Sequence, residues 1–444
     1  MTDSSNLPLT KHILESAASR VVERCDALAK FSEHPRWITR TFCSPAMAQA
    51  HGELRSWMET TGLECRVDAV GNLIGRQDNS SKQTLMIGSH LDTVINAGRY
   101  DGVLGVLLGL AVAEVVHQSK ESLPFNLDVV GFSEEEGVRY SFPFVGSLGI
   151  VGDLEQADLE RGDENSVTMK AALAEFGCDP SQSAQYGSSE LIGFIEAHIE
   201  QADLLQDASV PVGIVSAIAG QTRTAIVIEG TAGHAGTVGH DRRKDALAAA
   251  AELILEIEKI GQRTDGLFAT VGRISTQPGL SNVISGLTAI SLDLRHAQDD
   301  VREKAFEEIR SAIQTVQEKR SVVINLRNTQ LNPAVPMDAE LIKHLAAAVE
   351  GAGLPKQMMV SGAGHDAMIM ARATGSCMLF VRCRDGVSHH PNEFVSADDV
   401  EVALVVLARA VFNLANSIRQ CVSKSTKLNP GSRQWKFLVK HDLG

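Results

Sequence analysis

Alternation of short apolar segments with helical segments is the feature that most constrains the fold of this chain. Gln83–Ile87 is a short apolar strand that runs into a Gly-Ser-His sequence, residues 101–118 have the composition of a buried helix, and Asn126–Phe132 is a second core strand. Strand, polar loop, helix and strand in this order are typical of an α/β sheet. Apolar residues at helical spacing over residues 11–31 predict a further helix.

A segment with a different order of expected strands and helices begins near residue 215. Its expected strands and helices follow one another as strands 216–229 and 266–276 around helix 245–260, strand 285–295, helix 301–317 and strand 321–326. This βαββαβ-like order predicts a small α+β, ferredoxin-like domain.

The α/β pattern resumes after this segment. Asn328–Pro336 is interpreted as a linker, and helices at 338–351 and 397–419 flank a strand at 376–382. We therefore predict a catalytic domain made of residues 1–214 and 331–444, with residues 215–330 inserted as a second domain. Residues 155–190 are interpreted as a surface excursion, and the tail after Ser423 is polar and basic.

Composition argues against several classes of function. The 444 residues carry 41 Lys+Arg against 55 Asp+Glu, a net charge of −14, which disfavours a nucleic-acid partner. The apolar run Gly102–Val116 contains Glu114 and is shorter than the about 20 residues of a membrane span, and no signal peptide is visible, so no membrane partner is expected. Seven cysteines without a C-x-x-C pair indicate reduced thiols in a cytoplasm.

Polar residues stand where the two core strands end. His90 and Asp92 are two residues apart and point to the same side, so an imidazole could bind a metal while the carboxylate orients it; a capped loop with a solvated histidine is the alternative. Asp101, at a helix start, is either an N-cap or a buried carboxylate that needs a partner.

Three successive carboxylates, Glu134, Glu135 and Glu136, follow the second core strand. Such a run is usually a solvated surface. The carboxyl end of a core strand is, however, where α/β active sites lie, and there one carboxylate could bind a metal while another acts as a base.

Further histidines stand in the segments EAHIEQ, GHAG, SGAGHD and GVSHHP, and each could also be structural. The chain has no G-x-S-x-G elbow and no G-x-x-x-x-G-K-[ST] loop, which argues against a serine nucleophile and against nucleotide hydrolysis.

Taken together, these segments resemble the M20 metallopeptidase clan. The segments that carry the resemblance are GSHLDTV, RYDGVLGV, SEEEGVRY, EAHIEQ, GHAGT, SNVISG, LDLR, SGAGHDA and GVSHHPNE. Within the clan they are similar to the amidase branch, which contains N-carbamoyl-L-amino acid hydrolases and allantoate amidohydrolases. The resemblance covers about residues 15–420 and implies a phosphorylase/hydrolase-like catalytic domain whose inserted domain serves as lid and dimerisation domain.

The resemblance also implies a two-metal site. The matching ligands are His90 and His198 for a first metal, Asp101 as a bridge, and Glu136 and His389 for a second metal. Glu135 matches the general base and Asp92 the carboxylate that orients His90, while His390 stays an alternative to His389. Two divalent ions per subunit are expected, Zn²⁺ or Mn²⁺, with Co²⁺ or Ni²⁺ as further options.

Other positions match substrate contacts of the family, namely Gln201, His234, Asn282, Arg295 and the backbone of Gly362, Ala363 and Gly364. Arg295 can hold a carboxylate through two parallel hydrogen bonds, although a surface salt bridge would also explain it. His234 would stabilise the oxyanion. The chain departs from the branch at Ala202, where a glycine is usual, and in HAGTVGHDRR, which lacks a proline; both departures bear on specificity.

The expected function is cleavage of the terminal ureido bond of a small carboxylated substrate by a cytoplasmic homodimer joined through residues 215–330. The residues of the RYDGVLGV and SEEEGVRY motifs slightly favour allantoate over an N-carbamoyl-L-amino acid as the substrate. An M20 dipeptidase or aminoacylase, and a catalytically silent binding protein, are weaker alternatives.

Overall fold

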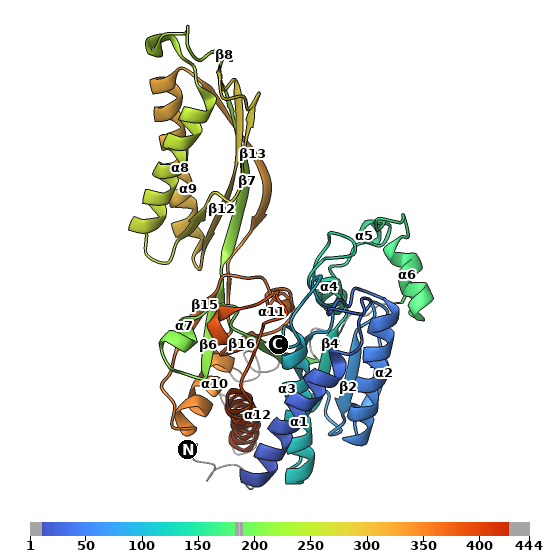
Figure 1. Ribbon diagram of the computed structural model, residues 1–444. Coiled ribbons are helices and arrows are strands. Elements are labelled where there is room, and N and C mark those ends of the chain that lie inside the picture. Colours follow the sequence, from blue (N-terminus) through green and yellow to red (C-terminus); the bar gives the residue numbers. More distant parts are fainter. Residues whose placement is uncertain (1–10, 183–185, 187–189, 426–444) are drawn as a thin grey trace. The chain divides into compact units, whose positions relative to one another are not determined.

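The structure is a computed structural model that describes residues 11–182, 186 and 190–425 and divides into two compact units (Figure 1). Unit 1 comprises the described residues up to Ser216, Met337–Met359 and those from His365 onward. Unit 2 comprises Ala217–Pro336 and Val360–Gly364. The N-terminal stretch judged for a signal peptide and most of the basic tail lie outside the described residues.

Unit 1 is built on a mixed sheet with the strand order β1-β2-β4-β3-β5-β16-β6-β14, and β15 also pairs with β6. The bounds are β1 Glu64–Val67, β2 Leu73–Gln77, β3 Thr84–His90, β4 Asn126–Phe132, β5 Leu191–Ile199, β6 Val212–Ile218, β14 Val335–Pro336, β15 Met358–Ser361 and β16 Ser376–Val381. The four central strands, β4, β3, β5 and β16, are parallel, and nearly all of their residues are buried. Such burial is expected for parallel strands covered on both faces.

Helices pack around this sheet. Their bounds are α1 Lys11–Leu28, α2 Pro45–Thr60, α3 Val103–Ser119, α4 Val145–Val151, α5 Gln156–Leu159, α6 Met169–Phe176, α7 Leu204–Asp207, α10 Ala339–Gly351, α11 Asp366–Met370 and α12 Ala397–Ser425. By length and composition, the segment Ala397–Cys421 of α12 could cross a membrane, but 61% of its apolar window is buried. It packs against α1, α3 and α10, as a core helix does.

Unit 2 is a five-stranded antiparallel sheet with two helices on one face. Its bounds are β7 Gly220–Glu229, β9 Phe268–Thr270, β10 Ile274–Gln277, β12 Leu287–His296, β13 Val323–Asn332, α8 Ala246–Arg263 and α9 Asp299–Arg320, with a separate pair of β8 Gly233–His234 and β11 Val283–Ile284. Alternate residues of β12 are buried. Its buried face meets the core formed with α8 and α9, and the opposite face is more exposed.

Two expectations about this region are corrected by the structure. The strand expected at 216–229 is two strands, since β6 ends at Ile218 in one sheet and β7 begins at Gly220 in the other. The linker expected from Asn328 is mostly strand, because β13 pairs with β7 as far as Asn332 across a bulge. Pro336 is accommodated in the two-residue strand β14 at the edge of the other sheet.

Candidate metal centre

His90 and Asp92 lie at the carboxyl end of β3, where this strand runs parallel to β4. His90 is 1% exposed, and its Nδ1 lies 3.1 Å from the carbonyl oxygen of Asp92. The Asp92 carboxylate accepts hydrogen bonds from the backbone N–H groups of Glu135 and Glu136, each at 3.0 Å. One buried carboxylate therefore joins the loop after β3 to the loop after β4.

Asp101 stands just before α3 and is buried, but it does not cap the helix. The N-cap residue is Gly102, at φ +67°, and no side chain caps this end. A Cβ at Gly102 would lie 2.4 Å from Cε1 of His90, so only glycine lets the His90 ring pack here. The Asp101 side chain is directed instead toward three histidines.

The two oxygens of the Asp101 carboxylate face different partners. Oδ1 lies 3.0 Å from Nε2 of His198 and 3.7 Å from Nε2 of His90. Oδ2 lies 3.3 Å from Nε2 of His389, which is itself 3.4 Å from Oε1 of Glu136. Three sets of ligand atoms lie within 4.8 Å of one another, namely His90/Asp101/His198, His90/Glu135/Glu136 and Asp101/Glu136/His389.

The imidazole geometry fits a bound cation. His198 Nδ1 lies 2.9 Å from the carbonyl oxygen of Ile199, and His90 Nδ1 is on the Asp92 carbonyl, so each ring keeps its proton on Nδ1. The two Nε2 atoms are then 3.4 Å apart, and both face the Asp101 carboxylate. A divalent ion placed between them would have both nitrogens and the Asp101 oxygen as ligands. Imidazoles mixed with carboxylates suit Zn²⁺ or Mn²⁺.

Buried acids gather around these rings. Burial, together with the charges of Glu136, Asp366 and Asp92, raises the pKa of Glu135 well above its ordinary value, although His90 opposes the shift. Burial and repulsion from Asp101 and Asp92 also raise the pKa of Glu136 to about 7. Buried carboxylates of this density require positive charge nearby, which divalent ions would provide.

Hydrogen bonds favour the charged forms of Asp101 and His389. Burial would raise the pKa of Asp101, but its contacts with His198 and His389 hold it well below the usual range. The hydrogen bond with Asp101 raises the pKa of His389 to about 9. Both histidines are exposed, but His389 Nε2 reaches Asp101 and Glu136, whereas His390 Nδ1 accepts a hydrogen bond from the N–H of Asn392. His389 is therefore the member of the pair that reaches the cluster.

Several residues around the centre were not singled out from the sequence. Ser388 Oγ donates to Asp101 Oδ2 at 2.7 Å, and its position directly before His389 was the only available signal. Arg40 is 1% exposed and donates from Nε to the carbonyl oxygen of Leu91, between His90 and Asp92. Arg40 stands in a segment without a recognisable motif, so only the structure could reveal it.

Gln201, expected to contact substrate, donates from Nε2 to Asp101 Oδ2 at 3.1 Å. The remaining expected substrate contacts lie in unit 2. His234 pairs with Val283 in the β8–β11 hairpin, beside Asn282, whose carbonyl oxygen accepts from the N–H of Ala235. Gly362, Ala363 and Gly364 follow β15 and belong to the short Val360–Gly364 segment of unit 2.

Arg295 lies at the opposite end of the unit 2 sheet from His234 and Asn282. It follows Leu287 by eight residues along β12, a separation of about 26 Å at the rise of a strand. The Arg295 guanidinium donates from Nε and Nη2 to the Asp293 carboxylate at 2.8 and 2.9 Å. Its Nη1 donates to the carbonyl oxygen of Gly362. Within one chain the structure brings Arg295 to Gly362 but not to His234.

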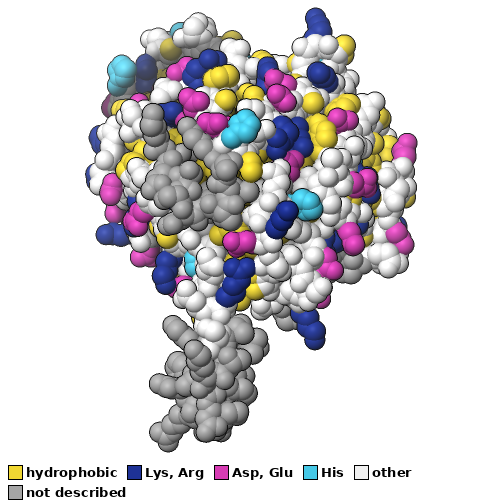
Figure 2. Space-filling view, turned by 90° about the horizontal axis from the view of Figure 1, so that it is seen from below, with side chains coloured by type: hydrophobic (Ala, Val, Ile, Leu, Met, Phe, Trp, Pro, Cys, Tyr) yellow, Lys and Arg dark blue, Asp and Glu magenta, His cyan; other side chains and the backbone are white. Residues whose placement is uncertain are grey.

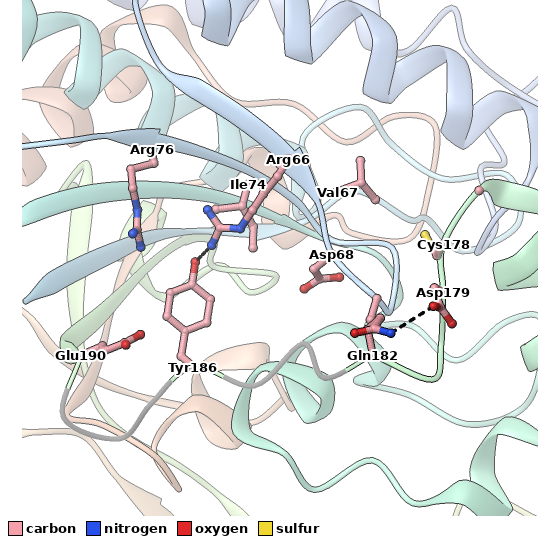
Figure 3. A pocket seen from close by; sticks show the side chains of 12 residues that line it. Arg66, Val67, Asp68, Ile74, Arg76, Cys178, Asp179, Gln182, Tyr186 and Glu190 are labelled. Atoms are coloured by element: carbon pink, nitrogen blue, oxygen red, sulfur yellow. Dashed lines mark hydrogen bonds between the residues drawn. The ribbon is translucent and has the colours of Figure 1, made fainter. Parts of the chain in front are cut away.

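Two pockets in unit 1 are lined by other residues. One, of about 450 Å³, is lined by Arg66, Arg76 and Tyr186 among others (Figure 3). Arg76 and the Tyr186 hydroxyl both donate to the buried Asp128 carboxylate, so their polar groups are already satisfied. The second, of about 970 Å³, lies beside Arg139 and Phe176. On the face in Figure 2, acidic and basic side chains are interspersed without a continuous basic stripe.

Imidazole and carboxylate groups clustered at the ends of parallel strands are a ligand set of the kind that metal-dependent hydrolases use. A family model described as peptidase family M20/M25/M40 matches residues 86–413. The chain therefore belongs to this family, and the resemblance inferred from its motifs is confirmed.

The names of individual relatives indicate which members of the family this chain is similar to. The allantoate deiminase of Arabidopsis thaliana is 37% identical over 89% of this chain and 82% of its own. The N-carbamoyl-L-amino-acid amidohydrolase of Pseudomonas sp. (strain NS671) is 38% identical over 80% and 88%. A hydantoinase/carbamoylase family amidase of Burkholderia ambifaria is 31% identical and superposes with a TM-score of 0.84 over 90% and 97%. The protein is thus an amidohydrolase that acts on carbon–nitrogen bonds other than peptide bonds.

Proposed function

We propose that the protein hydrolyses the terminal ureido bond of allantoate, releasing ammonia and carbon dioxide. The observation that carries the proposal is the buried Glu135 carboxylate within the ligand cluster formed with His90 and Glu136. The name of the Arabidopsis relative, allantoate deiminase, supports this substrate. The name of the Pseudomonas relative supports the second candidate, an N-carbamoyl-L-amino acid. Both substrates share a ureido group and a carboxylate.

Two divalent ions per subunit, Zn²⁺ or Mn²⁺, complete the proposed centre. His90 and His198 would hold the first, Glu136 and His389 the second, and Asp101 both, because its two oxygens face the two sets. When bound, these ions supply Lewis-acid polarisation of the ureido carbonyl and lower the pKa of the attacking water.

Side chains transfer the proton of the attacking water and stabilise the negative charges of the oxyanion and of the substrate carboxylate. Glu135, whose carboxylate lies in the ligand cluster, accepts the proton of the attacking water and returns it to the leaving nitrogen. Asp92 holds the backbone of Glu135 and the ring of His90 in fixed orientation. His234 donates a hydrogen bond to the developing oxyanion, and Arg295 binds the substrate carboxylate.

We further propose that the working form is a cytoplasmic homodimer joined through unit 2, which acts as lid. The separation of about 26 Å between the His234 and Arg295 ends of one sheet supports this, because a small substrate cannot touch both in one chain. A second copy would supply His234 and Asn282. None of the seven cysteines forms a disulfide, in keeping with a reducing compartment.

A substrate panel tests the activity. Ammonia release should be measured with manganese on allantoate, on several N-carbamoyl-L-amino acids and on a dipeptide. We expect the highest kcat/KM on allantoate, and Glu135→Gln should lower kcat at least about 100-fold while the metal content is unchanged. A higher kcat/KM on N-carbamoyl-L-amino acids would move the assignment to the second candidate, and full turnover by Glu135→Gln would refute the base.

Mixing two inactive variants tests the shared site. His234→Ala and Arg295→Ala homodimers should each be nearly inactive. Dissociated and reassembled together at equal amounts, they should recover about a quarter of wild-type activity, because half of the dimers are mixed and each holds one intact site. Activity that stays at the level of the separate variants would contradict a site built from two copies.

A further inference from the structure

Glu393 ends the motif GVSHHPNE, and the proposed chemistry gives it no role. Its side chain is 3% exposed. Oε1 accepts two hydrogen bonds from successive backbone N–H groups, those of Tyr100 at 2.8 Å and Asp101 at 3.0 Å. A residue from the last part of the chain thus holds the backbone of the central candidate ligand.

The surroundings hold this carboxylate in one place. A Cβ at Gly98 would lie 2.3 Å from Cδ of Glu393, so glycine is needed for the close approach of the 98–101 loop. The rings of Tyr100 and Phe394 meet edge to face at 6.4 Å. The carbonyl oxygen of Phe394 accepts from the N–H of Arg384 at 2.9 Å, which closes the turn formed by residues 384–394.

The same turn also reaches the Asp101 side chain. Ser388 Oγ and His389 Nε2 lie 2.7 and 3.3 Å from Asp101 Oδ2. Asp101 is therefore held at its backbone and at its carboxylate by one turn. His90 and His198, in contrast, are fixed by the buried strands β3 and β5.

Stability alone does not account for a carboxylate here. Among the described residues Glu393 takes part in no ion pair, and its Oε2 has no hydrogen-bond partner. Burying such a group beside the Asp101 carboxylate is unfavourable unless its contacts are needed.

We propose that Glu393 is a positioning residue, which aligns Asp101 with His389 for the second metal by accepting the N–H groups of Tyr100 and Asp101. Loss of this contact disturbs the Asp101/Glu136/His389 set more than the His90/His198 pair. Partners of this kind around metal ligands typically change metal affinity by about 10- to 100-fold.

Metal titration of the full-length apo-protein against a chelating dye tests the role without any turnover. In Glu393→Ala the weaker of two binding phases for Mn²⁺ should be displaced about 10- to 100-fold, with the tighter phase changed less. Glu393→Gln keeps an acceptor oxygen at the same reach and should restore the weaker phase to within a few-fold of wild type. Glu393→Asp, which withdraws the carboxylate by one methylene, should resemble Glu393→Ala and serves if that variant does not fold.

Glu114 offers a matched control, since it is another buried glutamate, and it lies on α3 away from the ligands. It is paired with Arg20 and Arg24 of α1. Glu114→Ala should lower the unfolding temperature but leave both metal phases in place. Unchanged metal affinities in Glu393→Ala and Glu393→Asp, or a loss in Glu393→Gln as large as in Glu393→Ala, would overturn the positioning role. The inference rests on the proposed centre, yet the two fail differently: a wild type that binds no metal refutes both, whereas wild-type affinities in the variants refute only the positioning role.

Discussion

Replacing Gly102 with alanine separates backbone strain from damage to the metal centre. The residue has φ +67° and ψ −55°, a sparsely populated region in which an L side chain costs roughly 1–3 kcal/mol. The new Cβ would also lie 2.4 Å from Cε1 and 2.5 Å from Nδ1 of His90. Ordinary contacts between such atoms are about 3.5 Å or more, so the ring must move by about 1 Å. Ligand distances in zinc sites tolerate about 0.2 Å.

Gly353 provides the control, because its φ is +74° and nothing lies within 4 Å of the Cβ position. Gly353→Ala also places a side chain at positive φ, but it should keep metal affinity and turnover. Gly102→Ala should lose at least about 10-fold in metal affinity and about 100-fold in kcat/KM. Dye competition, ammonia release and thermal unfolding measure the three quantities. A Gly102→Ala protein that matches Gly353→Ala in all three would refute the steric argument.

Three further expectations follow from the centre and its neighbours. The folded-state pKa of Glu136, about 7, lies above the ordinary pKa of a glutamate, so the metal-free protein loses stability as pH rises from that ordinary pKa through about 7. The folded-state pKa of His389, about 9, likewise lies above the ordinary pKa of a histidine. The stability that His389 contributes below its ordinary pKa is therefore lost as pH rises through about 9. The unfolding temperature with chelator should therefore be lower at about pH 8.5 than at about pH 6, and added manganese should reduce this slope; a flat profile with chelator would contradict the electrostatics. His90→Ala should lower the metal count by plasma emission spectroscopy from about two per subunit to about one, because the set on Asp101 Oδ2 does not use that ring; an unchanged count would exclude His90 as a ligand. Asp293→Asn should raise KM about tenfold with metal content unchanged, because Arg295 loses a charged partner that holds its guanidinium; an unaltered KM would show that Asp293 does not orient it.

Periodicity and motif order predicted much of unit 1. Asn126–Phe132 is the strand that its apolar run indicates, and the His90 strand extends to the histidine itself. Burial explains this success, because a fully buried parallel strand leaves a continuous apolar run in the sequence. The helix α2, in contrast, has mixed polarity and was not anticipated.

Contacts between residues far apart in the chain could not be predicted from the sequence, for a physical reason. The strand break at Ala219 depends on which sheet each half joins, and no local propensity encodes that choice. The candidate ligands were anticipated because short motifs carry them, and the structure brings His90, His198 and His389 to one carboxylate. The distance from His234 to Arg295 depends on strand register, which periodicity alone does not give.

The position of β16 between β5 and β6 has a consequence for biosynthesis. Both neighbours are complete by residue 218, whereas β16 spans Ser376–Val381. On the ribosome, the main-chain groups of β5 that later pair with β16 stay uncovered while the whole of Ala217–Pro336 emerges. An uncovered edge of this kind can pair with other chains, so the time before β16 is synthesised is when this sheet is most open to association.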